Sequence, residues 1–86
     1  MDTPDARVAM ALSRILEPAP DTPGPHFTDV FGSVRRWLVA YDYDCPPLGD
    51  VKRILRSTGL TTATRFGTQR VPDVRIMAGW SDPRER

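Results

Sequence analysis

Residues 59–80, GLTTATRFGTQRVPDVRIMAGW, constrain the fold of this chain more than any other stretch, because they do not fit a helix. The four threonines and Gly67 are weak helix formers, and Pro72 would break any helix that crossed it. Residues 60–66 and 74–80 instead alternate as strands do, with a connection that begins at Gly67. Pro72 cannot donate to a strand ladder, so it belongs at an edge or a bulge. The sequence therefore predicts a β-hairpin with an arginine-bearing tip, to which it assigns Arg65, Arg70 and Arg75.

Two amphipathic helices are predicted before this hairpin. Apolar side chains recur at helical spacing from Phe27 to Tyr41, and a second helix over 48–58 ends at Gly59 in the left-handed conformation. This second helix has an apolar stripe on one side. On its opposite side it carries three basic residues, Lys52, Arg53 and Arg56.

The beginning of the chain predicts a further, separate helix. Thr3 is placed to cap a helix over 3–17, and Pro18 ends it. The proline-rich segment that follows predicts an extended and fairly stiff linker. The predicted organisation is an N-terminal amphipathic helix at 1–17, a linker at 18–26, a main module at 27–80 and a flexible polar tail at 81–86.

Charge is distributed unevenly, although the formal net charge of the chain is only +1. Residues 1–33 hold two arginines against five carboxylates, a net charge of −3, and residues 34–86 have a net charge of +4. Within 52–75, six lysines and arginines face a single carboxylate, that of Asp73. This clustering favours an anionic partner, but a basic face that meets only solvent gives the same pattern.

A helix, a second helix and a two-stranded ribbon form the outline of a winged-helix domain. Such a domain usually has three helices before its wing, and the third one here is either the 3–17 segment or a short piece split from 46–58. The predicted fold class is α+β, a small winged-helix-like domain with two or three helices and a C-terminal β-hairpin. A basic helix beside a basic ribbon suits the phosphates and grooves of DNA. The predicted nucleic-acid-binding residues are Lys52, Arg53, Arg56, Arg65, Arg70 and Arg75.

A pattern of aromatic, apolar, glycine and arginine positions runs through both helices and the hairpin of residues 27–80. It consists of Phe27, Phe31, Trp37, Pro47, Leu48, Leu55, Gly59, Arg65 and Gly67. With these residues the segment resembles the C-terminal winged-helix domain of phage and poxvirus-type helicase–primases. The resemblance implies a free-standing or excised module that binds DNA without doing chemistry, in phage or plasmid replication or regulation.

An enzymatic function is not expected. The chain has no glycine-rich phosphate loop and no nucleophile elbow, and His26 lies at the edge of the proline-rich segment. One histidine and one cysteine, Cys45, do not make a zinc site without several carboxylates, so we expect no metal and no cofactor. Asp42 and Asp44 are explained as an acidic loop at a helix end rather than as a cation site. The lone thiol and the lack of a long apolar run favour a cytoplasmic protein.

A protein-binding role is the alternative to DNA binding. The amphipathic helix at 3–17, with its acidic flank, is of the kind that lies in a partner's groove or forms a homodimer. The chain would then be a small adaptor or a phage-encoded inhibitor of a host protein.

Overall fold

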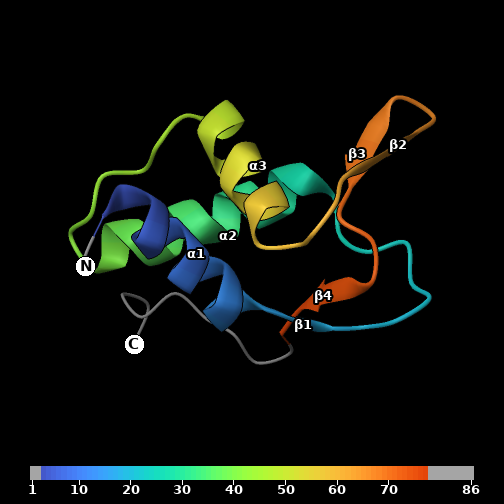
Figure 1. Ribbon diagram of the computed structural model, residues 1–86, viewed down its shortest axis with the longest axis horizontal. Helices are drawn as coiled ribbons and strands as arrows, with labels where there is room; N and C mark the ends of the chain where they lie inside the picture. The colour runs from blue at the N-terminus through green and yellow to red at the C-terminus, as the bar shows by residue number, and fades with distance from the viewer. Residues whose placement is uncertain (1–2, 78–86) are drawn as a thin grey trace.

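Residues 3–77 are described in a computed structural model, with the exception of the Arg65 side chain. They form three helices and four short strands. The helices are α1 (Pro4–Ile15), α2 (Phe27–Ala40) and α3 (Leu48–Ser57), and the strands are β1 (Leu16–Pro18), β2 (Ala63–Arg65), β3 (Thr68–Arg70) and β4 (Val74–Ile76). Figure 1 shows the helices gathered in one part of the molecule and the two small sheets in another. The predicted α+β class with a winged-helix-like layout is confirmed.

Helix α1 begins as its sequence predicts. The Thr3 hydroxyl accepts a hydrogen bond from the backbone N–H of Ala6 at 3.1 Å, and Pro4 occupies the first turn, where its missing N–H costs nothing. The helix ends at Ile15, earlier than predicted, because Leu16 already adopts an extended backbone and starts β1.

Helix α1 is part of the hydrophobic core. It packs against both α2 and α3, and its apolar stripe is buried, consisting of Val8, Ala11, Leu12 and Ile15. The 3–17 segment therefore supplies the third helix of the winged-helix layout. The division between a helical unit at 1–17 and a module at 27–80 is wrong, since both contribute side chains to one core.

The proline-rich segment at 18–26 is a strap held against the end of the chain, and the prediction of a linker there is corrected. The Ala19 N–H donates to the carbonyl of Asp73 at 2.9 Å, and the Val71 N–H donates to the carbonyl of Pro25 at 3.0 Å. These bonds continue the antiparallel pairing of β1 with β4, which places the first and last described strands side by side (Figure 1).

The hairpin differs from the predicted one. Strand β2 pairs with β3 around a two-residue turn, Phe66-Gly67, whereas β4 leaves the hairpin and pairs with β1. The predicted pairing of 60–66 with 74–80 is therefore wrong. The observed pairing differs because both turn residues have a left-handed backbone, with φ of 52° and 77°, and the chain therefore reverses immediately after β2. Trp80 and the predicted tail at 81–86 lie outside the described residues.

Helices α2 and α3 agree with the predicted helices to within one or two residues at each end. Gly59 follows α3 with a φ of +95°, as predicted, and Leu60 packs against the core. No helix in the described range has the length and hydropathy that a membrane crossing requires. Among the same residues, no group of three or more His, Cys, Asp or Glu side chains is arranged to hold a metal ion.

Candidate nucleic-acid interface

The solvent side of α3 is basic. Its buried side holds Val51, Ile54 and Leu55, and helical geometry then turns Lys52, Arg53 and Arg56 toward the opposite side. Arg53 and Arg56 are exposed. Lys52 is half-buried, with its Nζ 5.3 Å from the centroid of the Phe27 ring, so its stem covers part of the core while its ammonium reaches the surface. The structure thus brings three of the predicted residues together on one helix.

The intramolecular contacts of Arg53 and Arg56 are weak enough to be exchanged for an external anion. Arg53 Nη1 lies 3.4 Å from Oδ2 of Asp5, and the two side chains are 60% and 61% exposed. Exposed pairs of this kind contribute about 0–1 kcal/mol. Arg56 Nη2 donates to the Thr62 hydroxyl at 3.0 Å, a surface hydrogen bond to an uncharged acceptor. A phosphate oxygen would accept from either guanidinium in a stronger, charge-assisted bond.

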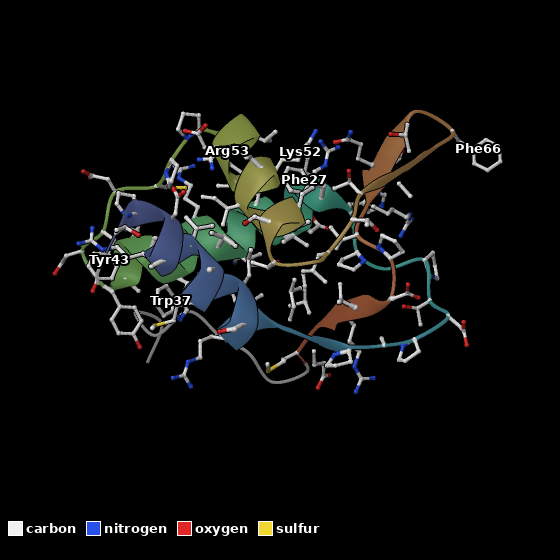
Figure 2. The ribbon with its side chains drawn as sticks, in the orientation of Figure 1. Phe27, Trp37, Tyr43, Lys52, Arg53 and Phe66 are labelled. Carbon is white, nitrogen blue, oxygen red and sulfur yellow. The ribbon has the colours of Figure 1, made fainter. Side chains whose placement is uncertain are left out.

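The β2–β3 hairpin projects beside this face. Figure 2 shows Lys52 and Arg53 on α3 and Phe66 at the hairpin tip along the same edge of the molecule. Phe66 is 94% exposed. Arg65 lies in β2, directly before the turn, and its side chain is outside the described part of the chain.

Arg70 has a structural position at the base of the hairpin. Its Nη1 donates to the carbonyl of Gly24 at 2.7 Å, and its Nη2 lies 3.3 Å from Nε2 of His26. The backbones of His26 and Arg70 also form an isolated antiparallel bridge. The side chain is half-buried. Arg70 therefore fastens β3 to the strap, and we do not expect it to reach a partner.

Arg75 lies away from the other predicted residues. It is in β4, where it faces Glu17 of β1, and its Nε donates to the Glu17 carboxylate. The prediction that Arg75 belongs to the hairpin with Arg65 and Arg70 is wrong, because β4 pairs with β1. Of the six predicted residues, the structure therefore brings three together on one surface, namely Lys52, Arg53 and Arg56, and it places the backbone of Arg65 in β2 of the hairpin.

A second surface was not identified from the sequence. A groove of about 720 Å³ lies between α1 and the end of α2, lined by Met10, Arg14, Trp37 and Tyr41 among others. The Trp37 and Tyr41 rings are 4.6 Å apart between centroids, and the Arg7 guanidinium lies 4.2 Å from the centroid of the Tyr43 ring. Two sequence signals could have indicated this groove. They are the seven-residue spacing of Arg7 and Arg14 and the four-residue spacing of Trp37 and Tyr41.

Cys45 does not have the properties of an activated nucleophile. Burial raises the pKa of its thiol above the ordinary value, an effect that the positive charge of Arg35 partly offsets. Its Sγ donates to the Pro46 carbonyl at 3.4 Å, within a half-buried loop. A raised pKa lowers the fraction of reactive thiolate at neutral pH.

Comparisons with known proteins found no relative of this chain. No protein-family model matches it, and neither a curated protein nor a solved structure shows significant similarity to it. The resemblance to the helicase–primase domain therefore stays a prediction, and the functional argument rests on the geometry of α3 and the hairpin.

Proposed function

We propose that this chain is a non-enzymatic DNA-binding module that docks α3 against a duplex and places the β2–β3 hairpin over the neighbouring backbone. The observation that carries the proposal is the basic solvent side of α3, formed by Lys52, Arg53 and Arg56 on the helix that precedes the hairpin. The major groove of B-DNA is about 12 Å wide, which admits an α-helix. A winged-helix-like layout supplies such a helix with a ribbon beside it.

The chemistry of the surface fits phosphate better than base edges. Arginine and lysine on α3 present several N–H donors to phosphate oxygens, and these contacts fix position and orientation without reading sequence. Asp50 is the only carboxylate on α3, and it lies in the first turn, where it stabilises the helix through the dipole. The account therefore predicts affinity that depends strongly on salt and weakly on sequence.

The proposed setting comes from the resemblance to helicase–primase domains. A module of this kind would hold DNA for a replication or regulatory assembly of a phage or plasmid while another protein does the chemistry. The sequence has one cysteine, Cys45, so it cannot form an internal disulfide, which fits the reducing cytoplasm that we propose as the compartment.

The packing of α1 disfavours the alternative of a partner-binding arm. Its apolar stripe, from Val8 to Ile15, is buried against α2 and α3, so that face does not serve a partner's groove or a second copy. A partner would have to use the outer side of α1, which offers the half-exposed Met10.

Fluorescence anisotropy with a labelled duplex of about 20 base pairs, roughly two helical turns, tests the proposal. The variant Arg53→Ala/Arg56→Ala removes two exposed charges from α3. We expect it to weaken binding and to reduce the slope of log affinity against log salt by about 1.8, since each lost phosphate contact is worth about 0.9. The matched control, Arg14→Ala/Arg75→Ala, removes the same charge from the last turn of α1 and from β4, outside α3 and the hairpin, and should change the slope much less.

Two results would contradict the proposal. One is the absence of binding by the unaltered chain to duplex or single-stranded DNA at low salt. The other is an equal loss of affinity and slope in both double variants, because this would show attraction by net charge without a defined face. Circular dichroism of each variant would confirm that the fold is retained.

A further inference from the structure

The groove between α1 and the end of α2 has the composition of a protein-binding surface. Met10 and Tyr41 are each 52% exposed, whereas Trp37, whose ring centroid lies 4.6 Å from that of Tyr41, is almost buried. Aromatic residues, methionine and arginine are enriched in protein–protein interfaces, and tryptophan, tyrosine and arginine dominate their hot spots. Every described residue that lines the groove, apart from Ala6, is of one of these types.

Both charged side chains among the described lining residues are arginines. The Arg7 guanidinium lies over the Tyr43 ring, and Arg14 follows two helical turns later, about 10 Å further along α1. Arg14 is exposed, and its guanidinium forms no hydrogen bond or ion pair within the part of the chain that the structure describes. This end of the groove therefore offers a cation to a carboxylate from outside the chain.

The other end of the groove has exposed carboxylates beside it. Asp42 and Asp44 flank Tyr43, which lines that end. An occupant is thus complementary when it presents an acid to Arg14 and none to these two aspartates. Nucleic acid does not meet this condition, because its phosphates repeat along the whole strand, and the almost buried Trp37 offers little ring face on which a base could stack.

We propose that this groove binds a short segment of another protein, which places an apolar or aromatic side chain against Met10 and Tyr41 and a carboxylate against Arg14. Ala6 and Arg14 are the outermost lining residues on α1, and they lie about 12 Å apart along the helix axis. About four extended residues span that distance. Such a segment buries the apolar surface of Met10 and Tyr41, which supplies affinity, while the charge pair fixes its direction.

The groove is a separate surface from the one proposed to bind DNA. Figure 2 shows Trp37 and Tyr43 at the end of the molecule away from the hairpin tip. Asp5, whose carboxylate Arg53 contacts, lies five residues before Met10 and hence about 140° away around α1. A segment bound in the groove therefore leaves α3 accessible, and this inference does not depend on the DNA-binding function.

A library of random short peptides is the probe that tests the inference. It is selected on the full chain carrying Arg53→Ala/Arg56→Ala, so that the basic side of α3 does not capture acidic peptides. The affinity of the enriched peptides for the unaltered chain is then measured by fluorescence anisotropy. We expect these peptides to share an Asp or Glu close to an aromatic or large aliphatic residue.

Two groove variants locate the binding surface. Tyr41→Ala should lower the affinity of the enriched peptides at least about 5-fold, the effect of losing one important interface contact. Arg14→Glu should lower it about 3- to 10-fold, because the substitution replaces an exposed attraction with a repulsion. A lysine in place of the peptide's carboxylate should restore affinity for Arg14→Glu, a rescue that a merely structural effect would not give. Circular dichroism of each variant checks that the fold is retained.

Each outcome supports or overturns the inference. It is wrong if no peptide is enriched, if the enriched peptides share no carboxylate, or if Tyr41→Ala binds them like the unaltered chain. A loss of affinity for duplex DNA in Tyr41→Ala would assign the groove to nucleic acid and overturn it as well. Peptide binding as expected, in a chain that binds no DNA, would leave the groove standing while the DNA-binding function fails, and the opposite pair of results would do the reverse.

Discussion

Leu12→Ala tests whether α1 belongs to the fold, on which the winged-helix layout depends. Leu12 lies in the middle of α1 and is 3% exposed. The substitution removes about three buried methylene equivalents, worth about 2.4 kcal/mol, and the cavity left behind raises the loss in unfolding free energy to about 2.5–4 kcal/mol. Alanine is the better helix former, so the loss reflects packing alone. In a domain of this size it should lower the Tm by roughly 10–30 °C.

The assay is thermal unfolding followed by circular dichroism, with Met10→Ala as the matched control on the same helix. Met10 is 52% exposed, so its truncation should cost less than about 1 kcal/mol. A helix that hung from the domain as an arm would make both substitutions equally harmless. A Tm for Leu12→Ala within error of the unaltered chain would therefore refute the reasoning.

Two further predictions concern the strap and the loop. Gly24→Ala should lower the unfolding free energy by at least about 2 kcal/mol in urea titrations, because Gly24 has a φ of +77° and a Cβ there would lie 1.6 Å from the Val71 carbonyl oxygen. Gly32→Ala in α2, where a Cβ meets nothing within 4 Å, should instead raise the unfolding free energy by about 0.5–1 kcal/mol. A change of the unfolding free energy in the same direction for both glycine substitutions would contradict the account. Iodoacetamide should alkylate Cys45 more slowly at mildly alkaline pH in the native chain than in the urea-unfolded chain, since burial raises the pKa of its thiol and keeps it protonated; equal rates would be inconsistent with this.

The helices were predictable because their signals are local. The apolar spacing of α2 and α3, the cap at Thr3 and the left-handed Gly59 each depend on neighbours within a few residues, and the structure shows all of them. The assignment of α1 to the core was left open by the sequence. An amphipathic stripe indicates that a helix is buried against something, but not whether that surface belongs to the same chain.

The strand pairings were not predictable in the same way. Each strand is three residues long, which is too short for its alternation to specify a partner or a register. Strand β4 pairs with β1 across most of the chain, and that pairing depends on the strap that returns to Asp73. The Phe66-Gly67 turn was missed because phenylalanine is not a residue that such a turn favours.

The residues of the candidate site show the same difference between local signals and tertiary contacts. Lys52, Arg53 and Arg56 share a face because helical geometry alone determines it. The environments of Arg70 and Arg75 depend on tertiary neighbours, Gly24 and Glu17 among them, that lie far away in the sequence. Charge counting along the chain does not distinguish an arginine that fastens the fold from one that faces a partner.

Backbone amide shifts measured during a titration with random-sequence duplex DNA test the central claim most directly. The account predicts that the shifts concentrate in α3 and in residues 62–70, that they diminish as salt is added, and that β1 and β4 change little. Shifts centred on the β1–β4 sheet or on the groove between α1 and α2, or no shifts at low salt, would contradict it.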